Sequence, residues 1–338
     1  MRLLKAFIAS LLRLALLGVA ALTALPLVWR IAPRLTIFEA FAPQFAAIGL
    51  LLVIFNLLFR SRGTALIGAV AVAWNLSLLW PEIAFTPRPA VAAAPQGPTL
   101  KLMTYNIFVG NGDADATRAM LAASGADVIG LMELRPEMKA ALASLHDIYP
   151  YAIDCVGVDP ACAIMLLSKQ PLRDAYAGRI DGRFPYIAEG EIDWHGTPVA
   201  ITVTHLSWPF MEPGDPEVDA ITRPQLTPIF PGVPRLSQSL QAANLAAYLN
   251  KRPADLIVMG DFNAPSWSAM LGAFRAATGL EDRGQLRFTW PAWSWPVLRL
   301  PIDHVFVRGK PAITQIRTGD GAGSDHLPLL AEITVPSR

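Results

Sequence analysis

The sequence predicts an α/β domain attached to a membrane by three helices, and three observations support this prediction. The 338-residue chain is 53% hydrophobic and only 16% charged, whereas ordinary soluble proteins carry about 25% charged residues. The apolar excess is concentrated in the first 80 residues. Beyond residue 98, short apolar segments typical of strands alternate with helical patterns. Composition therefore excludes a wholly soluble protein, a fibrous repeat and a disordered chain.

Charge divides the chain at the same place as hydropathy. Residues 1–97 carry eight Lys or Arg and two acidic residues, a net charge of +6, whereas residues 98–338 have a net charge of −5. We predict a membrane anchor over residues 1–80, a Pro/Ala-rich linker over 81–98 and a folded domain over 99–338. The last part is long enough to bury one large core.

Three stretches of the anchor are long and apolar enough to span a bilayer, which takes about 20 residues of helix. They are Ala6–Trp29, Leu35–Phe59 and Gly63–Trp80. A signal peptide followed by buried soluble helices is the alternative, but two further long apolar segments follow the first at once. Arg13 lies near one end and can extend its side chain toward the headgroups. Asn75 is expected to form a hydrogen bond between helices.

Basic residues at the ends of these spans predict the orientation. Four lie on one side and three on the other: Arg2, Lys5, Arg60 and Arg62 against Arg30, Arg34 and Arg88. Because cytoplasmic loops carry more Lys and Arg, the amino terminus is expected in the cytoplasm. Three spans then place the domain outside the cytoplasm, on a bacterial inner membrane or a plasma membrane.

The two cysteines bear on the same question. Cys155 and Cys162 are separated by the six residues VGVDPA, whose Gly and Asp-Pro indicate a turn. A disulfide between them would persist only in an oxidising compartment. The alternative is two unpaired buried thiols.

In the domain, the sequence predicts strands and helices in mixed order. Eight strands are expected, at Leu100–Ile107, Asp127–Leu134, Ala163–Ser168, Ile187–Trp194, Val199–Leu206, Leu256–Phe262, Ile302–Val307 and Leu329–Val335. Four helices are expected, at Ala114–Ala123, Pro136–Leu145, Leu236–Asn250 and Ser266–Ala277. A hairpin at Gly196-Thr197 indicates that the sheets are not purely parallel. Ser207–Pro234 holds seven prolines and is expected to be a long functional or mobile loop.

Polar residues stand at the ends of these apolar strands, where a buried sheet has no structural need of them. Oxygen ligands come from Asn106, Glu133, Asp261, Asn263 and Asp325, and imidazoles from His205 and His326. Carboxylates and amides without thiols favour a hard divalent cation, Mg²⁺ with Mn²⁺ as the alternative. Histidines beside such a cation can position water and stabilise a phosphoryl group.

The motifs that carry these residues resemble the endonuclease/exonuclease/phosphatase superfamily, in a membrane-anchored, bacterial-type form. They occur in the family's order: TYNI (104–107), GLMEL (130–134), THL (204–206), GDFNAP (260–265), IDHVFV (302–307) and GSDHLPL (323–329). The resemblance implies a catalytic domain over residues 99–338 with a four-layer sandwich of two mixed β-sheets flanked by helices. It implies a metal-dependent phosphoric ester hydrolase whose site lies at one end of the sheets.

The resemblance also implies roles for individual residues. Asn106, Glu133 and Asp325 correspond to the metal site, with Glu133 as the principal carboxylate. The catalytic group comprises His205, Asp261, Asn263, Asp303 and His326. In the family's pattern Asp261 orients water, Asn263 binds the phosphate, and Asp303 orients His326, while His205 acts near the leaving oxygen. Pro301 stands where many relatives have an Arg, so Arg299 is the candidate for that phosphate contact.

The net charge of the domain and its tryptophan-rich segment favour some substrate classes over others. A domain with a net charge of −5 suits nonspecific duplex binding poorly, so nucleic acid is not favoured as a partner. The segment TWPAWSW (289–295) can lie at the bilayer interface, stack on a substrate or pack beneath a sheet edge. A membrane phosphodiesterase or phosphomonoesterase, with a lipid headgroup as a candidate substrate, therefore ranks above an extracytoplasmic DNA or RNA nuclease. A catalytically silent, membrane-tethered binding module is the alternative of another class. Oligomeric state is not predicted.

Overall fold

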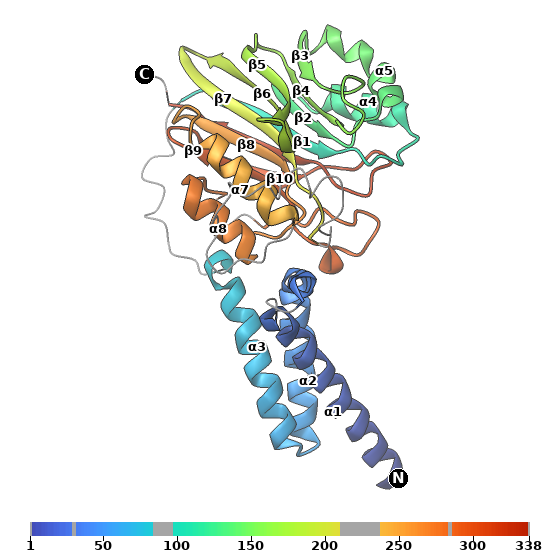
Figure 1. Cartoon of the computed structure of the whole chain (residues 1–338). Coiled ribbons are helices and arrows are strands. Elements are labelled where there is room, and N and C mark those ends of the chain that lie inside the picture. The colour runs from blue at the N-terminus through green and yellow to red at the C-terminus, as the bar shows by residue number, and fades with distance from the viewer. Residues whose placement is uncertain (1, 29–31, 84–96, 210–236, 283–285, 337–338) are drawn as a thin grey trace.

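The computed structural model describes residues 2–28, 32–83, 97–209, 237–282 and 286–336. Figure 1 shows a bundle of three helices beneath a larger α/β domain, with the amino terminus at the end of the bundle farthest from the domain. Most of the linker predicted over residues 81–98, namely 84–96, and most of the proline-rich segment, namely 210–236, lie outside the described residues.

The anchor consists of α1 (Arg2–Ala24), α2 (Ala42–Leu58) and α3 (Arg62–Ile83). All three segments are long and apolar enough to cross a membrane, as predicted. The second expected span is not a single α-helix: Pro33–Phe41 forms the 3-10 helix η2, and α2 begins at Ala42. Pro43 at the start of α2 explains this boundary, because proline favours the first turn of a helix and disfavours the helical conformation before it. α3 continues through Pro81, three residues past the predicted end of the anchor at residue 80.

Polar contacts within the bundle hold the three helices together. The Asn75 amide of α3 donates to the Thr23 hydroxyl of α1 at 2.9 Å, which confirms the predicted hydrogen bond between helices. Arg13 Nε donates to Ser61 Oγ at 2.7 Å, at the turn between α2 and α3. The amino terminus and this turn therefore share the end of the bundle away from the domain (Figure 1).

Two mixed sheets form the domain, as predicted. The first has the order β10-β11-β1-β2-β4-β3 and the second β5-β6-β7-β8-β9. The strands of the first sheet are β1 (Thr99–Asn106), β2 (Val128–Met132), β3 (Tyr151–Asp154), β4 (Ile164–Ser168), β10 (Ala312–Thr318) and β11 (Leu329–Thr334). Those of the second are β5 (Arg173–Ile180), β6 (Arg183–Trp194), β7 (Thr197–His205), β8 (Leu256–Asp261) and β9 (Asp303–Arg308). β1 runs parallel to β2 and β7 to β8, while the other pairs are antiparallel.

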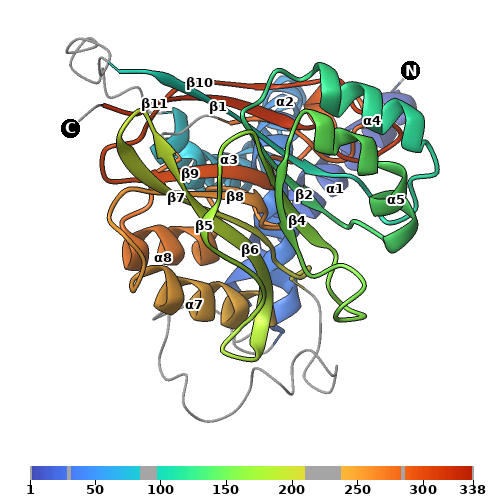
Figure 2. The same ribbon diagram turned by 90° about the horizontal axis from the view of Figure 1, so that it is seen from above.

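Helices cover the outer face of each sheet, which completes the four layers. α4 (Ala114–Ala123) and α5 (Pro136–Ala141) lie on the first sheet, and α7 (Ser237–Leu249) and α8 (Ala269–Thr278) on the second (Figure 2). One apolar cluster fills the space between the sheets and includes Leu102, Leu166, Val203 and Met259. Two further clusters lie beneath the helices.

Three strands escaped prediction, and all three lie at sheet edges. β3, β5 and β10 have partly exposed residues and lack a continuous apolar segment, because an edge strand is covered less than a central one. β3 leads into Cys155, which forms a disulfide with Cys162 across a Cα–Cα distance of 5.6 Å. The predicted pairing of the two cysteines is thereby confirmed.

The anchor and the domain are in direct contact. Trp267 Nε1 donates to the backbone carbonyl of Glu39 in η2 at 2.7 Å. Arg275 of α8 forms an ion pair with Glu82 of α3 at 3.2 Å. Each contact joins the second sheet's helical layer to the three-helix bundle, so the domain is held in a defined orientation above it.

Candidate active site

The sheet topology brings the predicted site residues to one place. Because β7 and β8 are parallel, His205 and Asp261 lie side by side at their carboxyl ends. Asp303 opens β9 opposite Asp261. In the other sheet, Asn106 ends β1, and Glu133 follows the parallel strand β2. The ends of both sheets therefore meet around Asp261.

Asn106 links the two sheets. Its side-chain amide donates to Glu133 Oε1 at 2.9 Å and to Asp261 Oδ2 at 3.0 Å. Its oxygen accepts the Phe108 N–H, and the Val109 N–H donates to Glu133 Oε2 at 2.8 Å. Asn106 thus presents its nitrogen to the carboxylates and holds both of them in place.

The backbone around these residues adopts conformations that ordinary side chains disfavour. Glu133 has a φ of 58° and Asn263 a φ of 50°, both in the left-handed region. Gly260 has a φ of 148°, and a Cβ there would lie 1.9 Å from the Thr204 carbonyl oxygen. At Glu133 and Asn263 such strain costs roughly 1–3 kcal/mol per residue, and strain of this kind is concentrated at functional sites.

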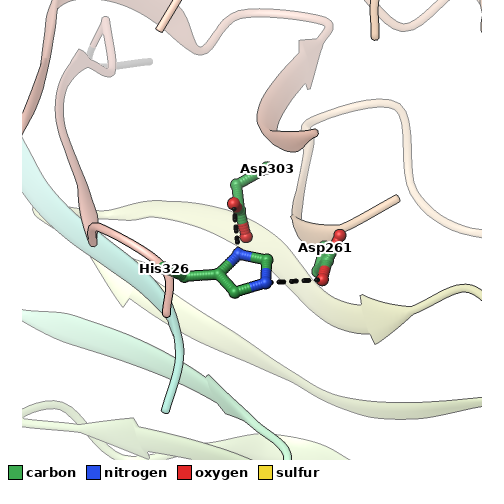
Figure 3. A group of neighbouring side chains, drawn as sticks. All are labelled: Asp261, Asp303 and His326. Atoms are coloured by element: carbon green, nitrogen blue, oxygen red, sulfur yellow. Dashed lines mark hydrogen bonds and ion pairs between the residues drawn. The ribbon is translucent and has the colours of Figure 1, made fainter. Parts of the chain in front are cut away.

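His326 lies between two buried carboxylates (Figure 3). Its Nδ1 donates to Asp303 Oδ2 at 2.8 Å, and its Nε2 lies 3.6 Å from Asp261 Oδ2. Thr289 Oγ1 donates to the same Asp303 oxygen at 2.6 Å. Asp303 is therefore fixed by two donors and fixes the orientation of the imidazole.

Burial and mutual charge shift the pKa values of this group. Burial by itself lowers the pKa of His326, but the charges of Asp303 and Asp261 and the hydrogen bond to Asp303 outweigh it and raise this pKa to about 10. Burial and the charge of Asp303 raise the pKa of Asp261 to about 6. The imidazole is thus held in its charged form next to an aspartate whose proton affinity is increased.

His205 and Asn263 complete the other side of the network. The Asn263 amide donates to the Leu206 carbonyl at 2.7 Å and lies 3.3 Å from His205 Nε2. His205 Nε2 is 3.6 Å from Asp261 Oδ2 and 3.9 Å from Glu133 Oε1. The Asn263 backbone N–H donates to Asp261 Oδ1.

Asp325 is connected to the site through the tryptophan segment. Trp290 Nε1 donates to Asp325 Oδ2 at 2.9 Å, and the Trp290 ring centre lies 6.5 Å from that of His326. Ser324 Oγ donates to the Asn106 carbonyl and accepts the His326 N–H. Among the described residues, no hydrogen bond or ion pair joins Asp325 to Glu133.

Sequence reasoning missed Thr289, Trp290 and Ser324 as supports of the site. The first two belong to the TWPAWSW segment, for which the sequence leaves three positions open: at the bilayer interface, stacked on a substrate, or packed beneath a sheet edge. Arg299, the candidate for a phosphate contact, instead donates to the Ser294 and Ala292 carbonyls and so braces this segment.

The residues present fit a divalent cation. Within the described part of the chain, one buried oxygen of each of Asn263, Asp303 and Asp325 has no hydrogen-bond partner. Such atoms are costly unless another group satisfies them. One ligand atom each of Asp261, Asp303 and His326 lies within 4.8 Å of the others. The carboxylate and amide oxygens gathered here suit a hard cation, whereas the charged His326 suits an anionic group beside it.

A family model for the Endonuclease/Exonuclease/phosphatase family matches residues 103–326. The chain belongs to this family. All eight predicted site residues lie within the matched range. The fold expected for a family member, two mixed sheets flanked by helices, is the one observed.

Solved structures agree on the fold. An endonuclease/exonuclease/phosphatase from Bacteroides vulgatus superposes with a TM-score of 0.54 at 15% identity, covering 70% of this chain and 99% of that one. Humanized TDP2 from D. rerio superposes with a TM-score of 0.53 at 16% identity, with the same coverage. No curated protein matches the chain.

Proposed function

We propose that the protein is a membrane-anchored, divalent-metal-dependent hydrolase of phosphate esters, acting as a phosphodiesterase or a phosphomonoesterase. One observation carries the proposal: Asp303, His326 and Asp261 form a buried line of hydrogen-bonding and charged groups that Asn106 joins to Glu133. A purely structural domain has no need of this many buried ionisable groups, since each costs free energy to bury.

We assign the side chains the distinct roles that the family resemblance implies. Glu133, Asn106 and Asp325 would hold the cation, Mg²⁺ or Mn²⁺, which supplies charge neutralisation at the phosphate oxygens when it is bound. Asp261 would accept a proton from the attacking water.

The remaining three side chains would act on the phosphoryl group. His326, kept charged by Asp303, would donate hydrogen bonds to that group. Asn263 would bind a phosphate oxygen, and His205 would face the leaving oxygen.

A nuclease is the second candidate. D. rerio TDP2, which shares the fold, has been solved with a single-strand DNA product, with a TM-score of 0.53 at 17% identity. The hollow beside Glu133 and His205 contains no Lys or Arg among its described lining residues. Because nucleic-acid affinity comes largely from basic side chains, this lining favours a substrate with fewer phosphates.

The activity can be tested on the full-length protein in detergent with bis(4-nitrophenyl) phosphate and 4-nitrophenyl phosphate. We expect hydrolysis with Mg²⁺ or Mn²⁺ and none after chelation, with recovery when the metal is restored. Hydrolysis that persists in chelator would contradict the metal dependence. Failure to hydrolyse either ester or single-strand DNA would favour the silent binding module.

We also propose that the domain lies outside the cytoplasm. The amino terminus and the Arg60–Arg62 turn lie at the end of the bundle opposite the domain (Figure 1), and the disulfide suits an oxidising compartment. A phosphatase reporter fused after Pro98 should be active outside the cytoplasm, and the two cysteines should react with a thiol reagent only after reduction. A reporter active only in the cytoplasm would reverse the orientation.

A further inference from the structure

An apolar cavity of about 380 Å³ lies between the anchor and the domain. Its walls include Ile37 and Phe41 of η2, and Trp208, Met270 and Trp290 of the domain. This volume falls within the range of about 300–1,000 Å³ found for small-molecule sites. The cavity is a space of ligand size that neither part of the protein forms alone.

The η2 wall is held firmly against the domain. The Glu39 carbonyl accepts from Trp267 Nε1, and the Glu39 carboxylate accepts from the Ala269 N–H. Ala40 is buried with Leu300 and Ile302, and Phe41 packs against this cluster. The cavity is therefore part of the folded arrangement of anchor and domain.

The cavity adjoins the candidate active site. Asn263 lines both this cavity and the hollow that contains Glu133 and His205, and so does Trp208. Trp290 lines the cavity, and its Nε1 donates to Asp325. Ile302, another wall residue, directly precedes Asp303. The apolar part of a bound molecule can thus stay between the cavity walls while its polar group reaches the network around Asp261.

The cavity also lies at the level where α2 enters the membrane. η2 directly precedes α2, and Gln44, in the first turn of α2, donates to the Val297 carbonyl at 3.2 Å. Shortly before Val297 in the chain, the side chains of Trp293 and Trp295 are 81% and 77% exposed. Exposed tryptophans at the end of a membrane helix suit the headgroup region of a bilayer.

The chemistry of the walls favours one kind of occupant. Of the described residues that line the cavity, only Glu39 is charged, and none is Lys or Arg. A nucleotide chain would find no cation there, whereas a hydrocarbon chain would be removed from water.

We propose that this cavity holds the hydrocarbon chain of a lipid phosphate ester and places its phosphate at the site formed by Asn263, His326 and Glu133. This inference rests on the proposed hydrolase activity and names its substrate class. The membrane anchor then has a second role, since η2 supplies one wall of the substrate site.

The test compares two substrates that differ only in chain length: ethyl and hexadecyl 4-nitrophenyl phosphate, with the full-length protein in detergent micelles. The variant is Ala269→Phe, which places a ring at the cavity wall. We expect the ratio of kcat/KM for hexadecyl over ethyl ester to fall by about ten-fold or more in this variant, because fewer methylenes can be buried.

Ala276→Phe is the matched control. Ala276 lies on the same helix and is exposed, but it does not line the cavity. Because the long ester partitions into micelles equally in both assays, the control separates that effect from the cavity. Ala276→Phe should keep the wild-type ratio of kcat/KM for hexadecyl over ethyl ester. An unchanged ratio in Ala269→Phe, with both esters still hydrolysed, would overturn the lipid site and leave the hydrolase standing.

A second measurement does not depend on turnover. Hexadecyl phosphate with a mid-chain diazirine is cross-linked to the protein in chelator, and the labelled peptides are mapped. We expect label in residues 36–41 and 264–270. Label confined to α1, α2 and α3 would overturn the inference, whereas label in the cavity without hydrolysis of either ester would overturn only the hydrolase proposal.

Discussion

The polar network around Asp261 and the apolar cavity beside it are neighbours that share Asn263, yet they are built in different ways. The network comes entirely from strand ends of the α/β domain and the loops beside them, and its groups satisfy one another through hydrogen bonds and charge. The cavity needs residues from both η2, next to the apolar helices, and the domain. Its walls offer a ligand apolar contact and little charge.

We therefore expect the polar network to carry out hydrolysis and the apolar cavity to select the substrate. The network needs residues of the domain only, whereas the cavity also needs η2 docked against the start of α8. Changes in the network should therefore affect turnover of every ester, and changes in the anchor contact should affect the cavity alone. The following predictions test that separation.

The largest effect is expected at the His326–Asp303 pair. His326→Ala and Asp303→Asn should each lower kcat by roughly 10²–10⁴-fold, the usual contribution of a positioned acid or base. The double variant should lose less than the product of the two single losses, because the carboxylate acts through the imidazole. Steady-state kinetics on a short-chain ester measures this. Losses that multiply fully would show that the two residues act independently.

A smaller effect is expected on metal affinity. Glu133→Gln keeps the shape of the side chain but removes the charge that holds the cation, so the half-saturating metal concentration should rise by about 10–100-fold. Titration of activity with Mg²⁺ and Mn²⁺ measures the shift. Glu137→Gln, an exposed change near the start of α5, is the control and should leave the titration unchanged. An unaltered titration in Glu133→Gln would remove Glu133 from the metal site.

Behind the network, His304 should make the domain sensitive to acid. Burial lowers the pKa of His304 below its ordinary value of 6.5, and its Nε2 donates to the Ala264 carbonyl at 2.8 Å. The unfolded chain therefore binds a proton on this histidine below about pH 6.5 that the folded chain does not bind, so the contribution of His304 to stability falls as the pH falls. Between the two pKa values the slope is about 1.4 kcal/mol per pH unit.

Thermal unfolding of the full-length protein at a series of pH values measures this slope. His304→Gln retains a donor for the Ala264 carbonyl but does not titrate, so its loss of stability below pH 6.5 should be shallower. Equal slopes in the two proteins would assign the acid sensitivity to other groups.

The smallest effect is expected at the anchor contact. Trp267→Phe removes the hydrogen bond to the Glu39 carbonyl, worth about 1 kcal/mol, so amide exchange in residues 36–41 should become roughly five-fold faster. Trp293→Phe, in the exposed loop, is the control. Hydrolysis of a short-chain ester should not change in Trp267→Phe. A loss of that activity would show that the network depends on the anchor after all.

Local sequence patterns predicted much of this structure. Continuous apolar segments predicted the eight better-covered strands, and residues such as Glu133 and Asp261 stood out because a polar side chain at the end of an apolar strand has no packing reason to be there. The spacing of Cys155 and Cys162 was short enough for a turn to pair them. Each of these patterns involves residues that are close together in the chain, so the sequence alone was sufficient to predict the feature.

Other features needed the tertiary structure, because they depend on residues that are distant in the chain. The edge strands β3, β5 and β10 have no apolar periodicity, since a neighbour on one side only covers them partly. Thr289 and Trp290 became supports of the site only when the fold placed them on Asp303 and Asp325. The cavity between Ile37 and Met270 exists because η2, more than 200 residues earlier in the sequence, docks against α8. Contacts of that separation are decided by packing in three dimensions, and no local pattern encodes them.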